Sequence, residues 1–250
     1  FGRYNALTLS EFFKEHPRAA LAFSGGVDSS YLLYAARQAG AQVQPYFVKT
    51  AFQPQFELHD AQRLCDELGV ELMVLYRDVL SHDEVCKNPA DRCYHCKRVI
   101  FEALLEQAAR DGYDVVLDGT NASDDAGDRP GMRALAELCV YSPLRECGLT
   151  KDEIRRRSRA AGLFTHDKPA YACLATRIPT GVRITQEDLS RIESAEDILF
   201  AMGFSDLRVR LFHDAARIQL PARQFSRAVK LHDEIESALG NYFPAVLLDL

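Results

Sequence analysis

Short apolar runs alternate along the first part of this chain with longer segments that repeat apolar residues every three or four positions. The short runs are residues 18–23, 43–49, 70–76 and 113–117. The periodic segments are residues 9–16, 29–40, 55–68 and 97–111. Short apolar runs bounded by proline or glycine are typical of buried parallel strands, and the periodic segments are typical of helices. The alternation predicts βαβ units around a parallel sheet.

The pattern changes in the second part of the chain. A helix is predicted from about Thr150 to Gly162, and residues 164–185 then lack periodicity. Next come a helix over 186–202, strands near 206–211 and 215–220, a helix over 223–239 and an apolar strand over 244–250. Adjacent strands joined at His213-Asp214 indicate a hairpin. We therefore expect an α/β domain over 1–168, an active-site loop and interdomain passage over 169–185, and a small α+β domain over 186–250.

The first predicted strand runs directly into Ser24-Gly25-Gly26-Val27-Asp28-Ser29-Ser30, which opens a helix. Glycines allow the backbone to approach an anion closely, and the first turn of a helix presents N–H groups that lack intrahelical partners. The serines add hydroxyl donors. A tight turn capped by Asp28 or Ser29 is the structural alternative, but the whole string favours a phosphate or pyrophosphate site.

A second polar turn, Asp118-Gly119-Thr120-Asn121, follows the fourth predicted strand. Functional sites in parallel sheets lie beyond the carboxyl ends of the strands, so both turns should face one crevice. The acidic segment 123–131 comes next. Its carboxylates could hold Mg²⁺ bridged by phosphates, and a solvated loop with Asx turns explains the same composition equally well.

Bulk composition narrows the class of protein. The chain has 250 residues, of which 47% are hydrophobic and 26% charged, as in an ordinary globular protein. The net charge of −6 argues against a general binder of nucleic-acid backbone. No apolar run is long enough to span a membrane, and the first residues have no signal-peptide pattern. We expect a cytoplasmic protein, in which the seven cysteines form no disulfide framework.

Three cysteines need separate treatment. Cys93 and Cys96 form a single C-x-x-C, which alone could be half a zinc site, a redox pair or chance. Tetrahedral zinc would need two further ligands, and neither a second C-x-x-C nor a paired-histidine spacing is present. Cys173 stands in the aperiodic segment, within Lys168-Pro-Ala-Tyr-Ala-Cys-Leu-Ala-Thr-Arg-Ile-Pro-Thr-Gly181.

The glycine string matches neither the Walker pattern nor the dinucleotide-binding fingerprint. It resembles the loop of the PP-loop ATP pyrophosphatases, which cleave ATP to AMP and pyrophosphate. The resemblance implies a Rossmann-like fold and assigns phosphate binding to Ser24, Gly25, Gly26, Val27, Asp28, Ser29 and Ser30. Asp28 is expected to act through Mg²⁺, because a bare carboxylate would repel phosphates.

Further motifs make the resemblance more specific. N-P-A-D-R-C-Y-H-C-K at 88–97, the D-G-T-N turn with D-R-P-G-M-R-A-L, and the Cys173 segment, all behind S-G-G-V-D-S-S, resemble the LarE family. Its members are ATP-dependent sulfur transferases of nickel-pincer nucleotide biosynthesis. They convert the carboxylates of pyridinium-3,5-biscarboxylic acid mononucleotide to thiocarboxylates.

The resemblance also implies two alternatives for the sulfur donor. In one form of the family the cysteine matching Cys173 gives up its own sulfur. In the other, cysteines matching Cys93, Cys96 and Cys173 hold a [4Fe-4S] cluster, on which a sulfide is the transferable sulfur. This sequence has the three-cysteine pattern, so we expect a cluster and an external sulfide source, with Cys173 as the catalytic residue.

Four basic residues are candidates for binding substrate or phosphate. Lys97 follows the C-x-x-C and Arg177 follows Cys173, while Arg208 and Arg210 lie on one face of a predicted strand. A guanidinium can bind a phosphate or carboxylate in bidentate fashion. The structural alternatives are a solvated lysine and a solvent-facing strand. Arg217, on the next predicted strand, continues the basic pattern.

Two other classes of function are consistent with the loop alone. A tRNA thiolase would use similar chemistry, although the acidic net charge counts against it. A regulatory module would bind nucleotide without chemistry, and the placement of the cysteines speaks against it. The LarE resemblance further implies a small-molecule nucleotide partner and a homo-oligomer. The net charge argues against a nucleic-acid partner, and the lack of a membrane-length apolar run argues against a membrane partner.

Overall fold

The computed structural model describes residues 7–124 and 130–250. Their contacts divide into two compact units. Unit 1 comprises residues up to Thr50, Gln55–Arg77 and Asp91–Ala170. Unit 2 comprises Ala51–Pro54, Asp78–Ala90 and Tyr171–Leu250. Two short segments of the first half of the chain thus belong to the unit that contains residues Tyr171–Leu250.

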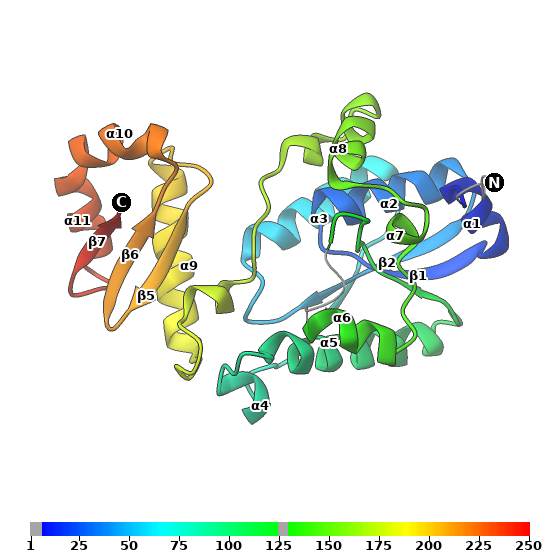
Figure 1. Ribbon diagram of the computed structural model, residues 1–250, viewed down its shortest axis with the longest axis horizontal. Helices are drawn as coiled ribbons and strands as arrows, with labels where there is room; N and C mark the ends of the chain where they lie inside the picture. Colours follow the sequence, from blue (N-terminus) through cyan, green and yellow to red (C-terminus); the bar gives the residue numbers. More distant parts are fainter. Residues whose placement is uncertain (1–6, 125–129) are drawn as a thin grey trace, which may run out of the picture. The chain divides into compact units, whose positions relative to one another are not determined.

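Unit 1 is built on a four-stranded parallel sheet in the order β3-β2-β1-β4 (Figure 1). Its strands are β1 (Arg18–Ala22), β2 (Gln42–Lys49), β3 (Met73–Tyr76) and β4 (Val116–Leu117). Its helices are α1 (Leu9–Glu15), α2 (Val27–Gln38), α3 (Gln55–Leu68), α5 (Arg92–Arg110), α6 (Pro130–Glu137), α7 (Pro143–Glu146) and α8 (Lys151–Ala160). The predicted α/β class with a parallel sheet is confirmed.

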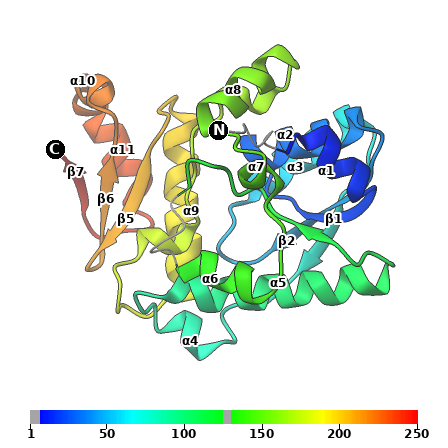
Figure 2. The same cartoon turned by 45° about the vertical axis from the view of Figure 1, so that its right-hand side comes forward.

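Helices cover both faces of this sheet. Side chains alternate between the faces along each strand, so each strand contributes residues to both helix–sheet interfaces. On one face Leu21 and Phe47 pack with residues of α1, α2, α3 and α8. On the other face Ala20 and Tyr46 pack with residues of α5 and α6. Figures 1 and 2 show α5 and α6 together below the sheet and α2 and α3 above it. Both faces are therefore buried, which explains why the strands appear as continuous apolar runs.

Unit 2 is built on a three-stranded sheet in the order β5-β6-β7. Strands β5 (Arg208–Phe212) and β6 (Ala215–Gln219) form the predicted antiparallel hairpin, and β7 (Val246–Asp249) pairs parallel to β6. The helices are α4 (Asp83–Cys86), α9 (Gln186–Ala201), α10 (Phe225–Lys230) and α11 (His232–Leu239). The second, smaller sheet with its helices is the expected α+β unit.

Several element boundaries differ from those predicted. Helix α5 begins at Arg92 rather than at 97, so the C-x-x-C lies inside the helix. Residues 130–137, the first two of which belong to the predicted acidic segment 123–131, form α6. The helix predicted over 223–239 is two helices, separated at Leu231, whose backbone has φ −102° and ψ 21°. None of the helices in the described ranges is both long and apolar enough to cross a membrane.

Candidate functional site

The phosphate loop connects β1 to α2 in unit 1. Gly25 has φ +68°, a conformation that favours glycine, and a Cβ there would lie 3.0 Å from the backbone nitrogen of Ala61 in α3. Gly26 is the N-cap of α2 and supplies no side-chain hydrogen bond to the helix. The N–H groups of the first turn of α2 thus have no side-chain cap, which is the arrangement that accommodates an anion.

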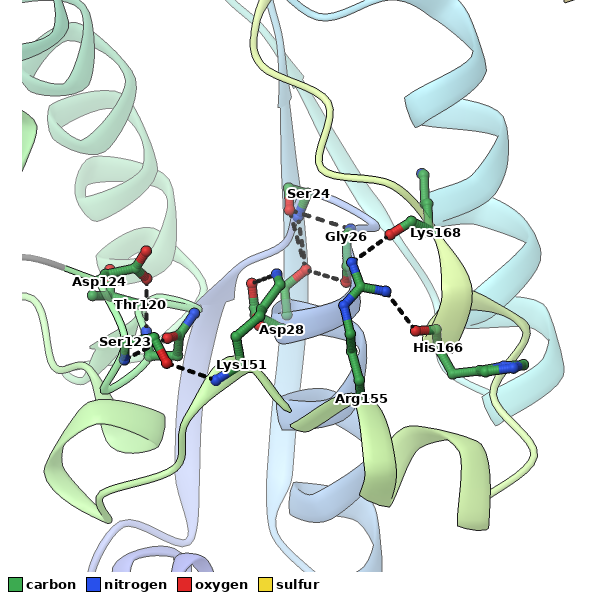
Figure 3. A network of polar contacts seen from close by, with 12 residues as sticks. Ser24, Gly26, Asp28, Thr120, Ser123, Asp124, Lys151, Arg155, His166 and Lys168 are labelled. Carbon is green, nitrogen blue, oxygen red and sulfur yellow. Dashed lines mark hydrogen bonds and ion pairs between the residues drawn. The ribbon is translucent and has the colours of Figure 1, made fainter. Parts of the chain in front are cut away.

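The hydroxyl groups of Ser24 and Ser29 lie in this loop and contact each other, and Figure 3 shows Ser24 beside Gly26. Ser29 Oγ accepts a hydrogen bond from Ser24 N and lies 3.2 Å from Ser24 Oγ, which in turn accepts a 3.3 Å bond from Gly26 N. Ser29 Oγ also donates to Gly26 O at 3.3 Å. These bonds are long for hydroxyl and amide donors. The donors of the loop are therefore weakly held by the loop itself and can turn to a phosphate.

An ion pair joins the loop to the start of α8. Lys151 Nζ lies 2.6 Å from Asp28 Oδ2, and both side chains are mostly buried. Asp28 Oδ1 is also buried and has no hydrogen-bond partner in the described chain. Burial raises the pKa of Asp28, while the ion pair with Lys151 opposes this. Asp28 thus presents a partly desolvated carboxylate oxygen with bonding capacity left, as a ligand for a hard cation would.

Lys151 is a site residue that sequence reasoning missed. Lys151 is the first residue of α8, and its N–H donates to Ser123 Oγ at 2.9 Å. The predicted cap, Thr150, does accept a bond from Glu153 N. A lysine in the first turn of a helix is electrostatically unfavourable because that end carries positive partial charge. A positive side chain at the positive end of α8 is therefore the sequence signal that Lys151 does not stabilise the helix and has another role.

The second polar turn adjoins the phosphate loop, as expected for two turns that follow the carboxyl ends of parallel strands. A Cβ on Gly119 would lie 3.1 Å from Ser29 N, so the turn packs directly against the start of α2. The Asp118 carboxylate accepts hydrogen bonds from Thr120 N, Thr120 Oγ1 and Ser142 Oγ. Through these bonds the Asp118 carboxylate stabilises the conformation of the turn.

The expected magnesium ligands of segment 123–131 fall largely on residues 125–129, which lie outside the described residues. Asp124 is described, and its Oδ2 accepts a bond from Asn121 N at 3.0 Å. Its charge also reaches the loop, because it acts to raise the pKa of Asp28.

Cys93 and Cys96 lie in the first turn of α5, with Cys93 exposed and Cys96 half-buried. Three positions apart on a helix, they share one face. Lys97 follows them. Its aliphatic stem packs against Gly131, since a Cβ on Gly131 would lie 3.0 Å from Lys97 Cδ. Both cysteines and Lys97 belong to unit 1, whereas Cys173 belongs to unit 2. Within residues 7–124 and 130–250 no three His, Cys, Asp or Glu side chains are grouped as metal ligands.

The segment that carries Cys173 is held within unit 2 by hydrogen bonds to its main chain. Leu174 N donates to Phe52 O at 2.9 Å, and Thr176 Oγ1 donates to Cys173 O at 2.8 Å. Farther along, Asn88 Nδ2 donates to Pro179 O at 2.8 Å. Phe52 and Asn88 belong to the two early segments of unit 2. Those segments therefore serve to hold the cysteine-bearing loop.

Arg177 lies at the centre of a buried polar network. Its Nε and Nη2 donate to the carboxylate of Glu196, and its Nη1 donates to Ala172 O at 2.9 Å. Glu196 also accepts bonds from Val209 N and from the Tyr171 hydroxyl. The pKa of Arg177 is raised: burial alone would lower it, but the bond to Glu196 outweighs burial, and Cys173 adds a smaller attraction. Glu196 thus occupies the guanidinium of Arg177, which also holds the carbonyl directly before Cys173.

One face of the small sheet carries the expected arginines. Arg210 pairs with Arg217 across the β5-β6 hairpin, and Arg208 lies two positions away on the same face of β5. Arg210 donates to Gln219 Oε1 and to Thr176 O, each at 2.6 Å. Burial lowers the pKa of Arg210, and the charges of Arg177, Arg208 and Arg217 lower it further. Such crowding of like charges favours a bound anion.

Comparisons with known proteins fit this geometry. A family model described as asparagine synthase matches residues 14–125, which include the phosphate loop. Pyridinium-3,5-bisthiocarboxylic acid mononucleotide synthase of Lactiplantibacillus plantarum is 31% identical over 97% of this chain and 89% of its own length. An uncharacterized protein of Synechocystis sp. is 36% identical over 97% of this chain and 92% of its own length. The tRNA-specific 2-thiouridylase MnmA of Pseudoalteromonas translucida is 28% identical over 61% of this chain and 51% of its own length.

Proposed function

This chain belongs to the LarE family, and from that membership we propose that it converts the carboxylates of pyridinium-3,5-biscarboxylic acid mononucleotide to thiocarboxylates at the expense of ATP. The observation that carries the proposal is the similarity to the Lactiplantibacillus plantarum synthase over 97% of the chain, together with the built phosphate loop.

The first proposed step is adenylylation. A carboxylate oxygen of the substrate attacks the α-phosphorus of ATP, the bond to the β-phosphate bridge breaks, and pyrophosphate leaves against the loop from Ser24 to Ser30. The donors of the loop and of the α2 N-terminus stabilise the charge on the leaving group. Lys151 supplies an ammonium 2.6 Å from Asp28 at the same place. Asp28, through its buried Oδ1, would hold the Mg²⁺ that accompanies ATP.

The second proposed step is sulfur transfer. Sulfur attacks the acyl carbon, forms the C–S bond, and AMP leaves with the electrons of the C–O bond. In one route the thiolate of Cys173 attacks. A base then takes the Cα proton of Cys173, the electrons of that bond form the Cα=Cβ bond of dehydroalanine, and the thiocarboxylate leaves with the electrons of the Cβ–S bond. In the other, Cys93, Cys96 and Cys173 would hold a [4Fe-4S] cluster, which would supply the sulfide for transfer. Their soft thiolate ligands fit such a cluster, and the spacing of Cys93 and Cys96 puts two of them on one helix face. The sequence favours the second route, and Cys173 is needed in both.

The substrate is proposed to bind through its phosphate and carboxylates. The arginine face of β5 and β6, with Arg208, Arg210 and Arg217, offers an anion site, and Lys97 offers a second positive charge in unit 1. Thr176 O accepts a bond from Arg210, so the arginine face and the Cys173 loop are joined within unit 2.

Mass spectrometry of the intact protein before and after turnover tests the donor. The purified protein is supplied with ATP and the dicarboxylate mononucleotide, and AMP, pyrophosphate and thiocarboxylate are measured alongside the protein mass. Loss of the mass of hydrogen sulfide, located at Cys173, identifies the sacrificial route. An unchanged chain that needs added sulfide identifies the cluster route, and a Cys93→Ala/Cys96→Ala variant with full activity contradicts that route. Absence of pyrophosphate release would contradict the function itself.

A tRNA thiolase is the second candidate, favoured by the 28% identity to MnmA over 61% of the chain. The net charge of −6 counts against a phosphate-backbone partner. A salt-dependent gel shift with tRNA separates the two, because the mononucleotide reaction requires no such binding.

A further inference from the structure

The side chain of Lys168 ends beneath the phosphate loop. Its Nζ donates to Gly25 O at 3.3 Å and lies 2.6 Å from Asp60 Oδ2 in α3. Only 14% of the side chain is exposed. No part of the adenylylation step described above uses this ammonium group.

The main chain of Lys168 is as firmly placed as its side chain. Arg155 of α8 donates from Nη2 to Lys168 O at 2.8 Å and from Nη1 to His166 O at 2.7 Å, as Figure 3 shows. Lys168 N donates to Thr165 O at 3.1 Å. Helix α8 thus fixes the backbone, α3 fixes the ammonium through Asp60, and the position of Nζ beside Gly25 is determined from both sides.

The Gly25–Gly26 peptide is the element that this ammonium contacts. In a trans peptide the carbonyl and the following N–H lie in one plane and point in opposite directions. Gly25 O faces Lys168, and Gly26 N–H consequently faces the loop interior, where it donates to Ser24 Oγ at 3.3 Å. Glycines on both sides of this peptide leave little steric resistance to its rotation. The bond from Lys168 opposes such a rotation.

We propose that Lys168 is a positioning residue for ATP, which holds the Gly25–Gly26 peptide so that Gly26 N–H is directed at the β- and γ-phosphates. The proposal rests on the proposed use of ATP and concerns unit 1 alone. The ion pair with Asp60 fits this role, because Asp60 keeps the Lys168 ammonium on the carbonyl side of the Gly25–Gly26 peptide. The neighbouring residue, Ala61, makes the close approach that requires glycine at position 25.

The sequence allows this peptide to be observed singly, because Gly25-Gly26 is the one Gly-Gly step in the chain. Protein labelled with ¹³C-carbonyl and ¹⁵N glycine therefore gives one carbonyl-to-amide correlation, from Gly25 C=O to Gly26 N–H. The spectrum is recorded for the wild type and for Lys168→Met, which keeps an apolar stem and removes the ammonium. Pyrophosphate affinity is measured on the same samples by calorimetry. Lys168→Arg retains the charge and donors, and Lys14→Met removes the same charge from an exposed position of α1.

In Lys168→Met we expect the Gly25 carbonyl resonance to move upfield and pyrophosphate affinity to fall about 10- to 100-fold, the range for a hydrogen bond to a charged group. Lys168→Arg should stay within about threefold of the wild type, and Lys14→Met should match it. A carbonyl resonance unchanged in Lys168→Met overturns the proposal, as does a shifted resonance with wild-type pyrophosphate affinity. If Lys168→Met does not fold, loss of affinity in folded Lys168→Gln supports the proposal and unchanged affinity overturns it. Wild-type protein that binds pyrophosphate but transfers no sulfur contradicts the proposed function and leaves this result standing.

Discussion

Arg177 Nε lies 2.9 Å from Glu196 Oε1, and neither side chain is more than 1% exposed. Through this pair α9 is tied to the loop that carries Cys173, since Arg177 also holds Ala172 O, the carbonyl directly before the cysteine. The conformation of the cysteine loop therefore depends on a carboxylate 23 positions farther along the chain.

Removal of the Glu196 carboxylate should destabilise unit 2 strongly. Glu196→Ala leaves the Arg177 charge buried and unpaired, which costs about 3–5 kcal/mol in the free energy of unfolding. Urea denaturation followed by circular dichroism measures this. Glu67→Ala is the matched control, because its partner Arg63 is 59% exposed and Glu67 itself 44% exposed. That variant should cost less than about 1 kcal/mol. Equal effects of the two substitutions would show that the buried pair has no special part in stability.

Lys151→Met should impair the use of ATP without unfolding the protein. The variant loses a charged donor beside the phosphate loop, and we expect kcat/KM for ATP to fall about tenfold or more. The measurement is pyrophosphate release at varied ATP. Lys230→Met, at an exposed position of α10, is the charge-matched control and should leave the rate unchanged. A Lys151→Met enzyme with wild-type kcat/KM would remove Lys151 from the site.

Gly119→Ala should weaken nucleotide binding by crowding. The new Cβ would lie 3.1 Å from Ser29 N, at the start of the helix that is proposed to bind phosphate. Gly40→Ala is a useful comparison, because Gly40 has open space around it but φ +76°. It should lower stability by about 1–2 kcal/mol, the cost of a left-handed conformation, and leave ATP affinity intact. ATP affinity is measured by calorimetric titration. A Gly119→Ala variant that bound ATP as tightly as the wild type would refute the prediction.

The cysteines should differ widely in reactivity. Burial raises the pKa of Cys65 to about 12 and that of Cys147 to about 11. At about pH 8.5 less than about one per cent of either thiol is the reactive thiolate, so both should resist iodoacetamide. Cys93 and Cys139 are exposed and should be labelled first. Peptide mass spectrometry over time gives the order, and early labelling of Cys65 would contradict the described packing.

The sequence predicted the features that leave a pattern in side chains. Strands buried on both faces appear as apolar runs, so the parallel sheet, the hairpin and the place of the phosphate loop could be foreseen. The start of α5 could not, because Arg92 to Cys96 is polar and its helical turn includes a buried arginine. Lys151 was overlooked because the capping pattern around it already explained a helix start.

Features held by the backbone escaped prediction for a different reason. Residues 51–54 and 78–90 join unit 2 through bonds such as Leu174 N to Phe52 O and Ile184 N to Cys86 O. Main-chain bonds of this kind leave no trace in residue types. The domain boundaries expected at 168 and 185, the oligomeric state, the cytoplasmic location and the cluster stay predictions.

The three-segment make-up of unit 2 constrains how the protein is made. Asn88 and Pro179, which are hydrogen-bonded to each other, are 91 residues apart. A ribosome needs roughly 5 to 20 seconds to add that many residues. Throughout this interval Phe52 and Asn88, both buried in the finished protein, are already synthesised while the loop that they help to hold does not yet exist. The packing of unit 2 therefore cannot be completed before the segment around Cys173 has been made, and a fragment consisting of residues 171–250 alone would lack part of its own interior.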